Sequence, residues 1–70
     1  MELKDIDLNL LLVFNELHRL RSVSQAAQAL GLSQSAISNA LNRLRKTLGD
    51  ELFVRVSRGM APTPFASELA

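Results

Sequence analysis

A run of short polar side chains stands in the middle of the chain, in the stretch SQSAISNALNRLRKTL that covers residues 33–48. Its first half carries hydroxyl and amide groups where a solvated helix more often carries Glu and Lys. These groups donate and accept hydrogen bonds, and an Asn or Gln amide can pair with adenine in the major groove of DNA. Arginine and lysine follow, and both bind phosphate. The pattern is typical of a surface that reads bases, although its composition alone fits a solvated helix face as well.

Helical geometry separates this stretch into two faces. At about 100° per residue, the apolar side chains fall on one side, and these are Ile37, Leu41, Leu44 and Leu48. The major groove is about 12 Å wide and admits one such helix, whose first turns lie nearest the bases. The predicted reading groups are Gln34, Ser35, Ser38, Asn39 and Asn42, and the predicted phosphate contacts behind them are Arg43, Arg45 and Lys46.

A long apolar helix is predicted in front of this stretch. It begins near Asp5 or Asp7, either of which can cap it, and it runs to about Leu20. Its apolar side chains recur at steps of three and four residues, which gives one buried face. The residues of that face are Leu10, Val13, Phe14, Leu17 and Leu20.

A second, shorter helix and a tight turn connect the two. We predict that Ser24 caps a helix over residues 25–30, and that Gly31 ends it because glycine adopts positive φ at little cost. Leu32 then fills the turn and Ser33 caps the third helix, which runs over residues 34–48 to Gly49. Three small residues would let the helices cross closely, and these are Ala26, Ala27 and Ala29. Helix, short turn with glycine and helix is the spacing of a helix-turn-helix unit.

The remainder predicts a β-hairpin and the start of another helix. Residues 52–56 are β-branched and apolar, the turn residues are Ser57, Arg58 and Gly59, and residues 60–62 return as a short strand. Leu52 and Phe53 must pack on the helices, because a lone hairpin is unstable in water. Thr63 and Pro64 then open a helix, with Thr as cap and Pro at its first position. The expected fold is therefore mainly α with a small hairpin, a winged helix-turn-helix over residues 1–62 followed by the first part of a further helix over residues 63–70, which the family resemblance given below identifies as a linker helix. We expect a longer protein, because the chain ends in the middle of this helical pattern.

Composition narrows the classes of function. The net charge is +1, but the acidic side chains gather in residues 1–17 and most of the Arg and Lys lie in residues 18–70. Segregated positive charge favours a polyanionic partner. The chain has no Cys and one His, and it has no glycine-rich phosphate loop, so we expect no catalytic residue, no metal and no cofactor. The absence of Cys fits the reducing cytoplasm, and no apolar run is long enough to span a membrane.

Nearly the whole chain, from about Asp7 to its end, resembles the N-terminal domain of LysR-type transcriptional regulators. The markers are the alanine pair Ala26 and Ala27, LGLSQSAIS, the basic tail of the third helix, LGDELFVR, and Thr63 with Pro64. The start MELKDIDLNLLLVFNEL and the segment SNALNRLR resemble the subgroup that includes nodulation regulators and activators of aromatic-compound degradation.

The resemblance implies a bacterial regulator that binds double-stranded operator DNA. It implies a homodimer or tetramer formed through the helix that begins at Pro64, and a small-molecule inducer bound by a C-terminal domain that this chain lacks. The matching positions make Gln34, Ser35, Ser38 and Asn39 base contacts, and make Ser33, Arg43, Arg55 and Arg58 backbone contacts. Most members have proline where this chain has Ser35, and many have arginine in place of Asn39, which leaves the bases that are read undetermined.

Three other functions remain as alternatives. An enzyme is disfavoured by the poor supply of catalytic residues. A protein-docking module would present an apolar outer face on the third helix. RNA binding would need stacking aromatic side chains, whereas the three aromatic residues all lie in apolar surroundings, and they are Phe14, Phe53 and Phe65.

Overall fold

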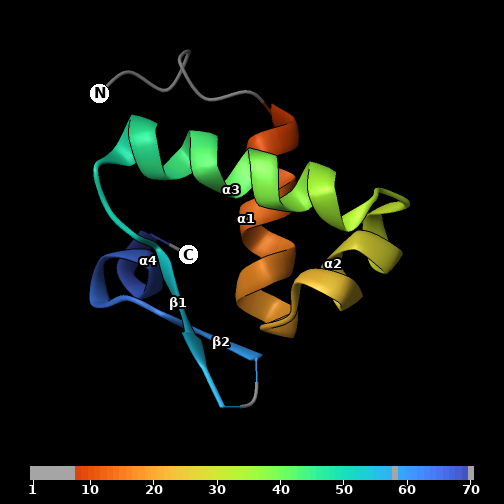
Figure 1. Cartoon of the computed structure of the whole chain (residues 1–70). Coiled ribbons are helices and arrows are strands. Elements are labelled where there is room, and N and C mark those ends of the chain that lie inside the picture. Colours follow the sequence, from red (N-terminus) through yellow and green to blue (C-terminus); the bar gives the residue numbers. More distant parts are fainter. Residues whose placement is uncertain (1–7, 58, 70) are drawn as a thin grey trace.

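Four helices and one hairpin make up the fold of the computed structural model, which describes residues 8–57 and 59–69 (Figure 1). The elements in chain order are α1 (Leu8–Leu20), α2 (Val23–Leu30), α3 (Gln34–Leu48), β1 (Phe53–Val56), β2 (Gly59–Pro62) and α4 (Pro64–Leu69). The first three helices contact one another, and α3 crosses α1 in Figure 1. The hairpin extends away from them, with α4 beside its base. The predicted class, mainly α with a small hairpin, is confirmed.

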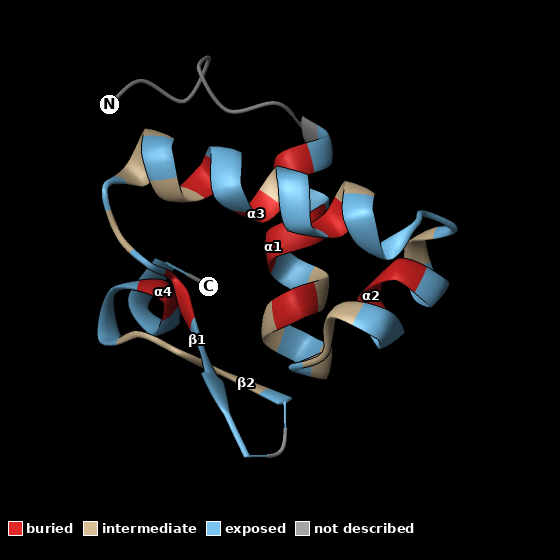
Figure 2. Cartoon of the chain, in the orientation of Figure 1, coloured by how far each residue is buried: buried red, intermediate tan, exposed pale blue. Residues whose placement is uncertain are grey.

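One apolar core joins the three helices to the start of the hairpin. Its members come from the four helices and from the start of the hairpin (red in Figure 2), and they are Leu10, Val13, Phe14, Leu17, Ala26, Ala27, Ile37, Leu41, Leu44, Leu52, Phe53 and Ala66. Leu52 and Phe53 are fully buried, and the Phe53 ring lies 5.6 Å from the Phe14 ring between centroids. The hairpin is therefore part of the folded body at its base, as the sequence predicts.

The hairpin is a regular antiparallel pair, called the wing below. Phe53 stands opposite Pro62, and Val56 stands opposite Gly59, where β2 already begins. The Met60 amide donates to the Arg21 carbonyl oxygen at 3.0 Å, which ties the far end of the wing to the turn between α1 and α2. Gly59 permits this approach, since a Cβ atom there would overlap the same carbonyl oxygen. The wing is thus held at its tip as well as at its base.

Helix ends agree with the sequence patterns except at the start of α2. Gly31 and Gly49 both end helices with positive φ, at 68° and 67°. The predicted cap Ser24 is wrong: α2 begins at Val23, and the Ser22 hydroxyl accepts from the Gln25 amide at 3.2 Å. Ser22 has the extended backbone that a capping residue requires, whereas Ser24 already lies in the first helical turn.

Two apolar assignments near the turn are also wrong. Leu32 is 45% exposed and does not fill the turn, and Ala29 is exposed on the outer side of α2. The Leu32 amide donates to the Ala27 carbonyl at 2.9 Å, so its backbone closes the helix end while its side chain remains on the surface. The proposed caps Asp5 and Asp7 lie outside the described residues. No helix in the described part of the chain has the length and apolar character needed to cross a membrane.

Candidate nucleic-acid interface

The outer face of α3 carries the polar side chains that the sequence places there. Seven of them are exposed, and they are Gln34, Ser35, Ser38, Asn39, Asn42, Arg43 and Lys46. On the inner face Ile37, Leu41 and Leu44 are between 0 and 3% exposed, and Leu48 is partly buried against the same core. Figure 2 shows the alternation of exposed and buried residues along the helix. The polar outer face disfavours the docking-module alternative, which predicts an apolar one.

The front end of α3 is fixed by a capping hydrogen bond. The Ser33 hydroxyl accepts from the Ala36 amide at 3.0 Å, which sets the angle at which the helix begins. The remaining free amides and the positive end of the helix dipole favour a negatively charged group at this end. Ser33 itself is exposed, so its hydroxyl can still donate to such a group.

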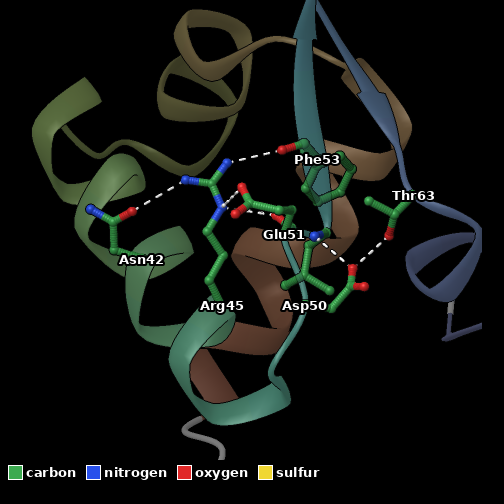
Figure 3. A network of polar contacts seen from close by, with 7 residues as sticks. Asn42, Arg45, Asp50, Glu51, Phe53 and Thr63 are labelled. Carbon is green, nitrogen blue, oxygen red and sulfur yellow. Dashed lines mark hydrogen bonds and ion pairs between the residues drawn. The ribbon is translucent and has the colours of Figure 1, made fainter.

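Arg45, which the sequence places among the phosphate contacts, has its guanidinium bonded within the fold. Its Nε donates to the Glu51 carbonyl at 2.8 Å, and its Nη2 donates to the Phe53 carbonyl at 2.9 Å. A third bond runs from Nη1 to the Asn42 amide oxygen at 3.3 Å (Figure 3). Arg45 therefore joins α3 to the first strand of the wing.

A second polar contact ties the other strand of the wing to the same junction. The Asp50 carboxylate accepts from the Leu52 amide at 2.8 Å and from the Thr63 hydroxyl at 2.6 Å (Figure 3). The Thr63 oxygen in turn caps α4 by accepting from the Ala66 amide at 3.1 Å, as the sequence predicts. The segment between α3 and the wing is thus held by Arg45, which bonds to Glu51 and Phe53, and by Asp50, which bonds to Leu52 and Thr63. Asp50 has a structural role, in line with its loop position in the sequence.

The wing lies close to the front of α3. A cleft of about 440 Å³ has Gln34 of α3 and Arg55 of β1 among its lining residues. Arg55 also lines a smaller cleft of about 250 Å³ together with Ser38 and Asn42. The structure therefore brings Arg55 beside the predicted reading groups. Arg58, the other predicted cation of the wing, lies outside the described residues.

Two serines that the sequence did not place at this interface share the larger cleft. Ser22 and Ser24, of which only Ser24 was expected to have a role, as a helix cap, reach the cleft from the start of α2, and their hydroxyl oxygens are 3.1 Å apart. The signal in the sequence was a pair of serines two positions apart at a helix start. The sequence alone does not show that the start of α2 faces the wing.

The two arginines at and just after the end of α1 are engaged locally. Arg19 donates to the Glu16 carboxylate through Nε at 3.0 Å and Nη2 at 2.7 Å, and Arg21 Nε donates to the His18 carbonyl at 2.7 Å. The hydrogen bond from Arg19, aided by its charge, holds the pKa of Glu16 below its ordinary value although partial burial opposes it. These contacts favour a local role for Arg19 and Arg21.

Comparison with known proteins agrees with this architecture. A model of bacterial regulatory helix-turn-helix proteins of the lysR family matches residues 8–67. Over 70 residues the chain is 61% identical to the HTH-type transcriptional activator NagR of a Ralstonia species, and it is 47% identical to Nodulation protein D 2 of a Bradyrhizobium species. The two alignments cover all of this chain but only 23% of NagR and 21% of Nodulation protein D 2. The predicted subgroup of nodulation and aromatic-degradation regulators is confirmed.

Solved structures show the same fold. A probable transcriptional regulator from Pseudomonas aeruginosa matches with a TM-score of 0.93 and 54% identity, covering 97% of this chain and 23% of that one. The BenM DNA-binding domain, solved in complex with catB site 1 DNA, matches with a TM-score of 0.71 and 28% identity, covering 99% and 80%. With its family pattern, its relatives and its fold in agreement, this chain belongs to the LysR family of bacterial regulatory helix-turn-helix proteins.

Proposed function

We propose that the chain binds double-stranded DNA in a sequence-specific manner through α3 and the wing, as the DNA-binding part of a bacterial transcriptional regulator. The observation that carries this proposal is the outer face of α3, which is exposed and polar along its length and has Arg55 beside it. The similar BenM domain was solved on DNA, which supports the same use of the fold. A regulator of this kind has no need of an enzymatic activity, and it works where the bacterial chromosome lies, in the cytoplasm.

The roles of the residues follow from their places on the interface. The first turns of α3 enter the major groove, so we assign base contacts to Gln34, Ser35, Ser38, Asn39 and Asn42. Contacts to the DNA backbone are assigned to Ser33, Arg43, Lys46, Arg55 and Arg58. Arg43 and Lys46 support this assignment because neither makes a side-chain hydrogen bond or ion pair with another described residue, which leaves both cations available.

The short helix α4 supports a role in assembly. Phe65 and Leu69 are 41% and 47% exposed on it, although both are large apolar residues. Helices with an uncovered apolar side associate readily, so we infer that the segment from Pro64 onward pairs copies of the protein into a dimer or tetramer. A small-molecule inducer would bind a further domain, since the chain accounts for less than a quarter of the length of NagR.

Titration with duplex DNA at several salt concentrations tests the proposal. With about four or five phosphate contacts for each half-site, the logarithm of the binding constant should fall with the logarithm of salt at a slope of about −4. Asn39→Ala should reduce discrimination between selected and random DNA by about 1–3 kcal/mol, because it removes a base contact. Arg55→Ala is the matched control, and it should weaken binding to both DNAs alike. Binding that ignores salt, or equal losses on both DNAs for Asn39→Ala, would contradict the proposal.

A further inference from the structure

One residue of the reading face is held in place before any DNA arrives. The Asn42 side chain accepts a hydrogen bond through Oδ1 from Arg45 Nη1 at 3.3 Å. The other four proposed base contacts, Gln34, Ser35, Ser38 and Asn39, make no side-chain hydrogen bond with another described residue. Asn42 therefore differs from its neighbours in having a preset orientation.

The chemistry of the pair determines which end of the amide faces Arg45. A guanidinium group has five N–H donors and no acceptor, so only the oxygen of the Asn42 amide can face it. The NH₂ group, which is donor only, must then lie on the other side. Figure 3 shows this arrangement, with the amide oxygen toward Arg45 and the amide nitrogen away from it.

Arg45 cannot easily turn to follow a change in Asn42. Two of its nitrogens donate to the carbonyl oxygens of Glu51 and Phe53, at 2.8 and 2.9 Å. Phe53 is fully buried, and its ring packs on Phe14, so this part of β1 has a fixed position. The orientation of the Asn42 amide is thus transmitted from the core of the domain through backbone carbonyls and one guanidinium.

We propose that Arg45 is a positioning residue that makes Asn42 a hydrogen-bond donor to the major groove, so that Asn42 selects guanine over adenine. This inference rests on the DNA-binding function proposed above. Guanine presents two adjacent acceptors, O6 and N7, which the Asn42 NH₂ group can meet. Pairing with adenine through two bonds uses the amide oxygen as an acceptor from N6, and in Asn42 that oxygen already accepts from Arg45 and is oriented by it.

Selection of bound duplexes from a random pool, made with the full chain, tests the proposal. Asn42→Ala identifies the base position in question, because only there should the preference fall, by about tenfold for the loss of one good hydrogen bond. The unaltered protein should select guanine at that position. Arg45→Met should abolish the preference for guanine over adenine there and leave the other positions unchanged. Lys46→Met is the matched control, which removes a cation of the same helix without touching Asn42 and should weaken binding to all sequences alike.

Several outcomes would overturn the inference. A purely structural Arg45 would lower affinity for every sequence in Arg45→Met without changing the base preferred at the Asn42 position. Selection of adenine at that position by the unaltered protein would also overturn it. Should circular dichroism show that Arg45→Met fails to fold, Asn42→Asp decides: it keeps a partner for Arg45 but has no donor, so guanine should give way to cytosine, whose N4 is a donor. Retention of guanine by Asn42→Asp overturns the proposal.

The same experiment separates this inference from the function on which it rests. If the unaltered protein enriches no duplex, the DNA-binding function fails. If it enriches a sequence that Asn42→Ala leaves unchanged at every position, DNA binding stands and the role given to Asn42 and Arg45 is overturned.

Discussion

The outer face of α3 and the junction between α3 and the wing use polar side chains in opposite ways. On the outer face Ser35, Ser38 and Asn39 are exposed and make no side-chain hydrogen bond with another described residue. At the junction, Arg45 and Asp50 each donate or accept two bonds of 2.6–2.9 Å within the domain. Both regions belong to one continuous stretch of chain, yet only one of them is left available to a partner.

This difference indicates a division between reading and positioning. A side chain that is free of internal bonds loses only its hydration when it meets a base edge, and its hydrogen bonds are replaced in the complex. A side chain that already makes several bonds within the domain is less available to a partner, but it fixes the geometry of the elements that carry the proposed base contacts. Asn42 lies where the two regions meet, since it is exposed on the outer face and bonded to Arg45.

The largest effect is expected where the wing tip meets the turn between α1 and α2. In Gly59→Ala the new Cβ atom would overlap the Arg21 carbonyl oxygen, at a residue whose φ is 98°. We expect a loss of about 3 kcal/mol in the free energy of unfolding, combining backbone strain with overpacking, together with weaker DNA binding from a displaced wing. Chemical denaturation and DNA titration of the same variant measure both.

Gly49→Ala is the control for this prediction. Gly49 also has positive φ, at 67°, but a Cβ atom there would meet nothing within 4 Å. Its cost should be about 1 kcal/mol from the left-handed backbone alone, with the wing and the DNA contacts unaffected. Equal losses in the two variants would show that the docking of the wing tip on Arg21 contributes nothing.

A smaller effect is expected from removing one bonded side chain of the junction. Asp50→Ala leaves the Leu52 amide and the Thr63 hydroxyl without their acceptor, and Leu52 is fully buried. The expected loss is about 2 kcal/mol in the free energy of unfolding, measured in urea, because buried donors without a partner are costly. Glu51→Ala is the adjacent control: its side chain is 73% exposed and 3.8 Å from Arg45 Nε, so the loss should stay below about 0.5 kcal/mol. If Asp50→Ala loses no more stability than Glu51→Ala, the Asp50 carboxylate does not hold the junction.

The sequence predicted the exposed polar face of α3 better than the contacts that hold it in place, and the reason is physical. The bounds of α3 follow from its cap Ser33, its terminal Gly49 and the regular spacing of its apolar residues, all of which are local in sequence. The cap of α2 was misplaced because Ser22 and Ser24 both suit the pattern, and only the backbone angles decide between them. The internal bonds of Arg45 were not predicted because two of its partners are backbone carbonyls, which every residue possesses.

The same limit applies to the surface and the wing. Leu32 was expected inside because it is apolar, but its position just after a left-handed glycine leaves its side chain on the surface. The contact between the Met60 amide and the Arg21 carbonyl joins residues far apart in sequence and involves no side chain, so the types of these residues do not predict it. The outward side of a helix can be inferred from its period, whereas long-range bonds to the backbone require the fold.

The smallest effect on stability is expected from the surface ion pair between Arg19 and Glu16, which serves as a comparison for the junction. Arg19 is 62% exposed and its partner is the Glu16 carboxylate one turn earlier, whose pKa lies below its ordinary value of 4.5 mainly because of the hydrogen bond from Arg19. A lowered pKa in the folded state means that this pair stabilises the fold above the ordinary pKa and loses that effect as pH falls through the lowered one. The stability difference between the unaltered protein and Glu16→Gln should therefore be small at neutral pH and disappear as the pH falls through that lowered pKa.

Glu51→Gln completes this test on the junction side. Arg45 is held mainly by two carbonyl oxygens, so replacing the distant Glu51 carboxylate should change the stability little. Urea unfolding measures this difference at neutral pH, and it measures the Glu16→Gln difference from neutral pH into acid. A Glu16→Gln difference that persists in acid would show that Glu16 acts by packing and not by charge. A Glu51→Gln loss as large as the Glu16→Gln loss would show that the junction depends on an ion pair, and the contrast between Arg45 and Arg19 would then be one of degree.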